Sequence, residues 1–111
     1  INVSQTSNWL ISWIINLQYD TTVDQLKKIR NEIEDHINNS KDFNKSIGVA
    51  VRVDKFAESS IDMYVRCFTN SESWNNWLQV KENLAIAIKQ IVEKNGAAFA
   101  FPSQSIYVEK K

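Results

Sequence analysis

Cysteine and histidine are nearly absent from this sequence, which contains one of each, Cys67 and His36. A single cysteine excludes an internal disulfide, a zinc site built on several thiolates and a cysteine-ligated iron–sulfur cluster. A single histidine excludes most histidine-rich metal sites, and it is the only histidine that a catalytic thiol would have as its base. We therefore expect no metal site, no catalytic residues and a buried, structural Cys67.

Glycine and proline are also scarce, because the chain has two glycines and one proline. Neither the G-x-x-x-x-G-K-[ST] pattern nor the G-x-G-x-x-G pattern occurs in it. Loops that hold the phosphates of a nucleotide or a dinucleotide cofactor are therefore excluded. The sequence predicts no cofactor and no enzyme activity.

Charge of one sign is not in excess, because thirteen basic residues balance thirteen acidic ones and the isoelectric point is about 6.8. Proteins that bind nucleic acid or anionic membranes are typically basic, so both classes are disfavoured. The longest nearly apolar run, residues 9–15, is shorter than the roughly 20 residues of a transmembrane helix. The first residue is an isoleucine, which favours a fragment of a longer protein.

The 111 residues that are present suit one domain with one core. Apolar and polar residues alternate in residues 11–19, 47–53 and 61–67, which predicts three strands with one buried face each. The inward residues are expected to be Ile11, Trp13, Ile15, Leu17 and Tyr19, then Ile47, Val49, Val51 and Val53, then Ile61, Met63, Val65 and Cys67.

Two helices are predicted between the strands. The first begins at a capping box formed by Thr22 and Gln25 and ends at the polar residues 38–40. The second begins near residues 71–73 and ends at residues 95–96, where a glycine favours helix termination. The residues expected to face the sheet are Leu26, Ile29, Ile33 and Ile37 in the first helix and Trp74, Trp77, Leu78, Leu84, Ala85, Ile88 and Val92 in the second.

Residues 99–108 form the last predicted strand, which Pro102 interrupts. The order of elements is therefore β-α-β-β-α-β. Right-handed crossovers place the first and third strands in the centre of the sheet. The sequence thus predicts an α+β fold, a ferredoxin-like plait with a four-stranded antiparallel sheet and two helices on one face.

The uncovered face of this sheet is the expected binding surface, and it would carry Ile14, Arg52, Tyr64, Arg66 and Phe68. Aromatic and arginine side chains in such a place are typical of RNA-recognition domains. The third strand lacks their K/R-G-F/Y-G/A-F-V-x-F/Y pattern, however, and the chain has no net charge, so nucleic acid is disfavoured. We expect another protein segment to cover this face.

In the second predicted helix, one apolar residue lies outside the apolar face and one charged residue lies within it. Ile86 lies off the apolar stripe, which favours a contact with another protein. Lys81 lies within the stripe, so we expect either that its stem extends past Trp77 and Leu78 or that its charge meets a carboxylate. The acidic residues of the first helix alternate with basic ones and are expected to face solvent.

Three sequence strings carry a resemblance to a known family. Y-D-T-T-x-x-Q-L occupies residues 19–26, W-L-x-x-K-E-x-L occupies residues 77–84, and F-A-F-P-S-Q occupies residues 99–104. Together they resemble the cytoplasmic carboxy-terminal domain of small-conductance mechanosensitive channels, the MscS family. The similarity runs over most of residues 13–109.

The resemblance implies that the parent protein is a channel of the bacterial inner membrane that opens under tension and releases solutes after osmotic downshock. Such channels usually form sevenfold rings, whose cytoplasmic domains enclose a solute-filtering vestibule and hold the subunits together. By resemblance, residues 1–10 end a preceding β-domain and residues 11–111 form the ferredoxin-like domain. The arginine-rich stretch that many relatives carry before the first strand is replaced here by Q-T-S-N-W-L.

Contacts with other copies of the chain or with its upstream β-domain and transmembrane segments are expected at Tyr64, Phe68, Ile86, Phe101, Pro102, Ser103 and Gln104. Two alternatives stay open. One is a soluble ferredoxin-like regulatory domain that binds a small ligand. The other is an acylphosphatase-like enzyme, although its anion-binding loop would fall where this chain has Asp20.

Overall fold

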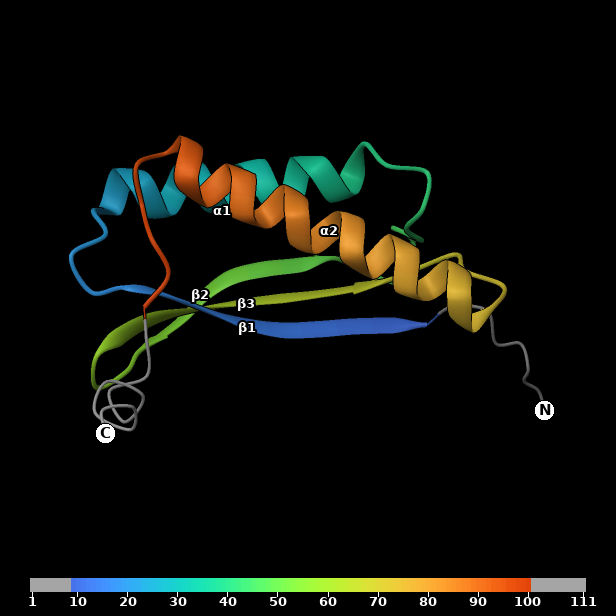
Figure 1. Cartoon of the computed structure of the whole chain (residues 1–111), viewed down its shortest axis with the longest axis horizontal. Helices are drawn as coiled ribbons and strands as arrows, with labels where there is room; N and C mark the ends of the chain where they lie inside the picture. Colours follow the sequence, from blue (N-terminus) through green and yellow to red (C-terminus); the bar gives the residue numbers. More distant parts are fainter. Residues whose placement is uncertain (1–8, 101–111) are drawn as a thin grey trace, which may run out of the picture.

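The computed structural model describes residues 9–100, in which two helices cover one face of an antiparallel sheet (Figure 1). The sheet order is β1-β3-β2, so the third strand of the chain lies in the centre. This is the predicted α+β arrangement. In chain order the elements are β1 (Leu10–Gln18), α1 (Val23–Asn38), β2 (Ala50–Phe56), β3 (Ser60–Phe68) and α2 (Trp74–Lys94).

The fourth strand, predicted over residues 99–108, lies mostly outside the described residues. The described part of the chain therefore holds three strands rather than four. Phe99, the first residue of the predicted strand, forms an antiparallel bridge with Leu17 of β1. The chain after α2 thus returns to the edge of β1 that faces away from β3.

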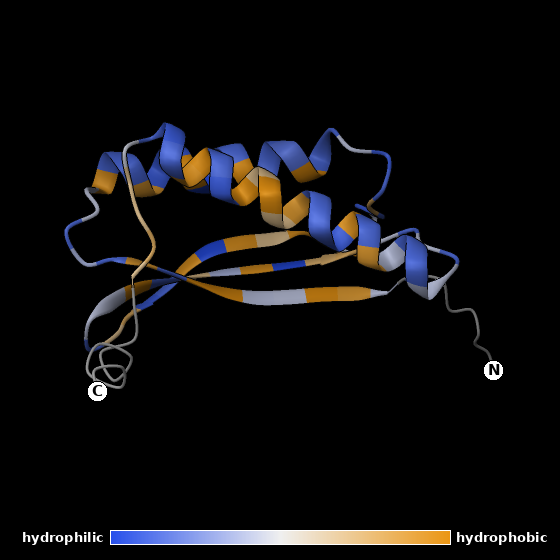
Figure 2. Cartoon of the chain, in the orientation of Figure 1, coloured by the Kyte–Doolittle hydropathy of each residue, from blue (hydrophilic) through white to orange (hydrophobic). Residues whose placement is uncertain are grey.

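The core lies between β3 and the two helices. Every second residue of β3 points into it. In Figure 2 the apolar colour of the two helices lies mainly on the side that faces the sheet. Antiparallel pairing sets an apolar residue of β1 opposite each of these β3 residues. The pairs are Ile11 with Cys67, Trp13 with Val65, Ile15 with Met63 and Leu17 with Ile61.

The capping box predicted at the start of α1 is present. The Thr22 hydroxyl accepts the backbone N–H of Gln25 at 3.1 Å, and the Gln25 side-chain oxygen accepts the backbone N–H of Thr22 at 2.8 Å. The Gln25 amide nitrogen also donates to the Asn95 carbonyl at 2.9 Å, and Lys94 forms a 3.1 Å ion pair with Glu32. The start and the middle of α1 are thereby joined to the end of α2.

The inward face predicted for α2 is partly wrong. Trp74 is 60% exposed and Ala85 is also exposed, although both were expected to face the sheet. The buried residues recur every four positions from Val80, which the prediction omitted. Residues four positions apart lie on the same side of a helix, so this side faces the sheet. Trp74 and Ala85 lie on other sides of the helix. The buried set is Val80, Leu84, Ile88 and Val92.

Three residues predicted to face inward in the strands are exposed. Tyr19 lies beyond the end of β1, and Ile47 lies before the start of β2. Val53 is inside β2 but is 39% exposed. The pairing of β2 with β3 shifts between Val53 and Lys55, and such a bulge at a sheet edge turns side chains away from the core.

The packing of α1 predicts that truncation of one buried isoleucine strongly lowers the stability of the domain. Ile33→Ala removes a fully buried side chain and is expected to lower the free energy of unfolding by about 2–5 kcal/mol. Ile86→Ala makes the same change at an exposed position of α2 and is expected to alter it by about 0.5 kcal/mol or less. Urea unfolding followed by circular dichroism measures both values. Equal losses in the two variants would contradict the described core.

Candidate functional site

The face of the sheet that the helices leave uncovered, here called the outer face, carries the side chains that the strand pattern predicted. Tyr64 of β3 lies between Ile14 of β1 and Arg52 of β2. Ile14 is 48% exposed, and Arg52 is exposed as well. The outer face therefore combines apolar, aromatic and basic groups at its centre. Its members from these three strands are Leu10, Ser12, Ile14, Arg52, Tyr64, Arg66 and Phe68.

Hydrogen bonds and cation–π contacts order the centre of the outer face. The hydrogen bond with Ser12 lowers the pKa of Tyr64 below its usual value, and Arg66 lowers it further. The guanidinium carbon of Arg66 lies 5.4 Å from the ring centroid of Phe68, a distance typical of cation–π attraction. Tyr64 and Phe68 thus each interact with Arg66 on the outer face.

A buried polar cluster lies at the other end of the same face. The Asn16 side-chain amide donates to the Asp62 carboxylate at 2.6 Å, and the Ser60 hydroxyl donates to the same oxygen at 2.9 Å. Asp62 is only 6% exposed, so these two donors replace water at its carboxylate. Because the cluster joins β1 to β3, we assign it a structural role in holding the register of the two strands.

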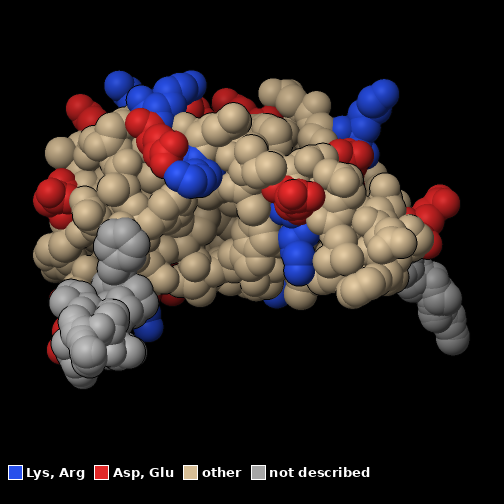
Figure 3. Space-filling view, in the orientation of Figure 1, with Lys and Arg blue, Asp and Glu red and all other residues tan. Residues whose placement is uncertain are grey.

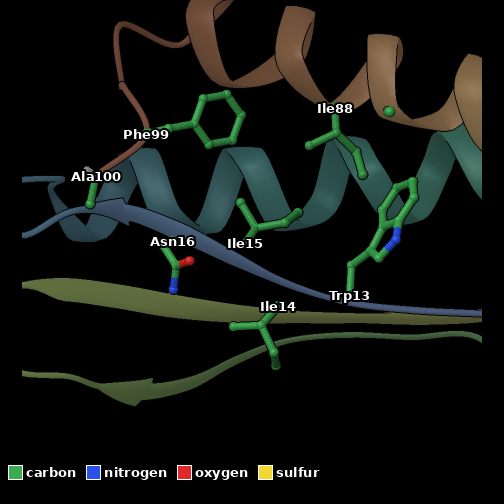
Figure 4. A pocket seen from close by; sticks show the side chains of 8 residues that line it. Trp13, Ile14, Ile15, Asn16, Ile88, Phe99 and Ala100 are labelled. Atoms are coloured by element: carbon green, nitrogen blue, oxygen red, sulfur yellow. The ribbon is translucent and has the colours of Figure 1, made fainter. Parts of the chain in front are cut away.

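An apolar groove of about 340 Å³ runs along the edge of β1 below α2. Figure 4 shows Phe99 and Ile88 on the helical side of the groove, with Ile15 and Trp13 pointing toward them from β1. Ile14 points to the opposite face of the strand. The lining residues are Trp13, Ile14, Ile15, Asn16, Ala85, Ile88, Phe99 and Ala100.

The first half of α2 carries an aromatic and basic stack. The rings of Trp9 and Trp77 lie 5.6 Å apart at a tilted angle, and the Lys81 ammonium nitrogen lies 4.2 Å from the Trp77 ring centroid. Lys81 therefore extends over Trp77, as predicted, and its charge contacts an aromatic face. This arrangement packs the first half of α2 against the residue that precedes β1.

Cys67 and His36, the two residues first considered for chemistry, differ in their exposure to solvent. Cys67 is fully buried under the helices, and burial raises the pKa of its thiol to about 12, which keeps it neutral at physiological pH. His36 is exposed in the last turn of α1. Within residues 9–100, no group of three or more His, Cys, Asp or Glu side chains is placed to hold a metal ion. Neither helix of that range is long and apolar enough to cross a membrane.

The residues predicted for subunit or domain contact lie on two separate surfaces. Tyr64 and Phe68 are half-buried on the outer face, whereas Ile86 is 51% exposed on α2 in the helical layer. In Figure 3 the charged side chains lie mainly over the helices, and a wide uncharged surface extends below them. Outside the described residues lie Phe101, Pro102, Ser103 and Gln104.

The groove along β1 was missed by reasoning from the sequence. Its lining combines residues of β1, α2 and the segment after α2, which are far apart in the chain, so no local pattern marks it.

The chain is similar to known mechanosensitive channel proteins. The family described as "Mechanosensitive ion channel MscS, C-terminal" matches residues 11–99. An uncharacterized MscS family protein of Aquifex aeolicus is 29% identical over 109 residues, which are 98% of this chain and 30% of that protein. The low conductance mechanosensitive channel YnaI of Escherichia coli is 30% identical over 108 residues, which are 97% of this chain and 31% of that protein. The chain thus spans less than a third of the length of these two relatives.

Two solved structures share the fold. Arabidopsis thaliana MSL1 superposes on 92% of this chain and 37% of its own with a TM-score of 0.79 and 18% identity. The closed state of Helicobacter pylori MscS superposes on 91% of this chain and 38% of its own with a TM-score of 0.68 and 21% identity. At these identities the likeness concerns the arrangement of helices and strands.

The burial of Cys67 predicts a pH-dependent stability. Because the thiol pKa is raised from 9.0 to about 12, the unfolded chain loses this proton above pH 9 while the folded chain keeps it. The thiol's contribution to stability is therefore present below pH 9 and is lost as the pH rises toward 12. Urea midpoints measured across this range are expected to fall more steeply in the natural chain than in Cys67→Ala. Alkylation by iodoacetamide at pH 8 is expected only after unfolding, and rapid alkylation of the native chain would contradict the burial.

Proposed function

The chain belongs to the MscS family of mechanosensitive ion channels, and from this we propose that it is a wall segment of the cytoplasmic vestibule of a tension-gated channel. In this role the domain binds neighbouring copies of itself and helps to filter the solutes that the channel releases during osmotic downshock. The parent protein then lies in a bacterial inner membrane, with this domain on its cytoplasmic side.

The observation that carries the proposal is that the family match, residues 11–99, extends over all five helices and strands, which run from Leu10 to Lys94. The distribution of exposed apolar side chains supports the assembly of several copies. Ile14 and Leu10 on the outer face and Ile86 on α2 are each exposed by a third or more, on two different surfaces of one chain. Apolar groups on separate surfaces suit a subunit with a neighbour on each side.

The proposed assembly is a ring of identical chains, sevenfold by resemblance to the family. Residues 1–10 then connect to a preceding β-domain, and residues 11–111 form the vestibule domain. Within this assembly we assign contact roles to Tyr64, Phe68, Ile86, Phe101, Pro102, Ser103 and Gln104.

A small-ligand-binding regulatory domain is the weaker proposal. Its best candidate site is the groove along β1, where Asn16 is the sole polar side chain of the lining. The Asn16 amide already donates to Asp62, so it offers a ligand little specific recognition.

Current recordings test the proposed function directly. The full-length parent protein, expressed in bacteria that lack their own mechanosensitive channels, is expected to give currents when suction is applied to excised patches. Patches from cells with an empty vector serve as the control. A parent protein that is inserted in the membrane but gives no tension-dependent current would contradict the proposal.

A charge at Ile86 is expected to weaken the assembly without unfolding the domain, because this side chain is already half exposed. Ile86→Asp is expected to lower the fraction of assembled full-length protein in detergent, measured by mass photometry. Lys28→Asp introduces an acid at an exposed position of α1 and serves as the matched control. An unchanged assembly in Ile86→Asp would remove Ile86 from the proposed contact.

A further inference from the structure

We propose that the outer face of one copy of the chain binds the exposed surface of α2 around Ile86 in a second copy. In this contact Ile14 packs against Ile86, and Arg66 pairs with Glu82. The inference rests on the proposed assembly of identical chains, and it names the two surfaces that meet. It follows from the apolar groups and the charges that each surface leaves without a partner.

The outer face combines apolar surface with basic charge that the chain itself does not neutralise. Ile14 is 48% exposed on this face. Arg66 and Arg52 are both exposed, and neither forms an ion pair within the described part of the chain. Asp54 lies near enough to act on Tyr64 through its charge, but the two arginines outnumber it. The outer face therefore suits a partner surface that is apolar and acidic.

The exposed surface of α2 around Ile86 has this complementary character. Ile86 is apolar and 51% exposed. Glu82 lies one helical turn before it, is exposed, and forms no ion pair with any residue that the structure describes. The other charged residues on this side of α2 are Lys89 and Glu93, which pair with each other. The charge that remains unneutralised beside Ile86 is therefore a carboxylate.

The two surfaces also match in the spacing of their apolar and charged groups. In the register of β1 and β3, Ile14 lies opposite Tyr64, which makes Arg66 its diagonal neighbour on the outer face. Diagonal neighbours of this kind lie roughly 7–8 Å apart. Residues four positions apart on a helix, such as Glu82 and Ile86, lie about 5–6 Å apart. The long arginine side chain covers the difference, so the apolar contact and the ion pair can form together.

A contact between these two surfaces is heterologous. The helices cover one face of the sheet, so the outer face and α2 lie on opposite sides of one chain (Figure 1). Each copy then uses its outer face toward one neighbour and its α2 surface toward another. Heterologous contacts close into rings when the rotation between copies allows it. The inferred contact therefore agrees with the proposed cyclic assembly.

Exchange of the two charges in the full-length parent protein tests the inferred ion pair. Arg66→Glu and Glu82→Arg each bring like charges together, and each is expected to lower the assembled fraction several-fold, measured by mass photometry in detergent. The double variant restores opposite charges and is expected to recover most of the lost assembly. Arg66→Glu combined with Asp35→Arg is the control, because Asp35 is exposed on α1, and its assembly is expected to stay impaired.

Cross-linking of the same protein tests the inferred apolar contact. Two differently tagged chains, one carrying Ile14→Cys and the other Ile86→Cys, are co-expressed and treated with a short bismaleimide. We expect a covalent dimer that carries both tags, at a yield several-fold above that of a control pair in which Lys28→Cys replaces Ile86→Cys. Lys28 is exposed on α1. The natural Cys67 is buried and is not expected to react.

The outcomes of the two tests separate the inference from the proposed function. If the charge-exchanged double variant recovers no assembly, or if an assembled protein gives no cross-link above the control, the inference is overturned and the proposed function stands. A natural parent protein that neither assembles nor gives tension-dependent currents overturns both.

Discussion

The burial of one face of β3 is the constraint on which the rest of the structure depends. This strand has a neighbour on each side, and both helices lie over it. Met63 and Val65 are fully buried at its centre, and each such side chain stabilises the fold by roughly 1.5–3 kcal/mol. Because successive side chains of a strand alternate in direction, the same constraint sends Tyr64 and Arg66 to the outer face. The core and the outer face are thus two consequences of one strand.

Local patterns were sufficient to predict the parts of the fold that local physics decides. The alternation of apolar and polar residues in β3 predicted its buried face, and the Thr22 capping box predicted the start of α1. The errors lie where tertiary geometry decides. The buried side of α2 is set by its angle to the sheet, which Trp74 does not follow, and the exposure of Val53 results from a bulge in an edge strand.

The same distinction holds for the candidate site. The outer face follows from strand alternation, so Tyr64 and Phe68 were placed correctly from the sequence. The groove along β1 depends on the bridge between Leu17 and Phe99. These two residues are far apart in the sequence, so no local pattern predicts that they meet. Ile86 was predicted to be exposed because it departs from the apolar stripe of its own helix, and it is exposed. Its separation from the outer face depends on how the two layers stack.

Gln25 belongs to two helix ends at once. Its backbone and side-chain oxygen complete the capping box of α1, while its amide nitrogen holds the last carbonyl after α2. Gly96 follows with a positive φ of 77°, and a methyl group there would lie 3.4 Å from that nitrogen. The end of α2 is therefore joined to the first turn of α1 by Gln25 and to the middle of α1 by the ion pair between Lys94 and Glu32. Because these contacts join the two helices at the same end of the fold, a force on the chain after α2 would act on α1 as well as on α2.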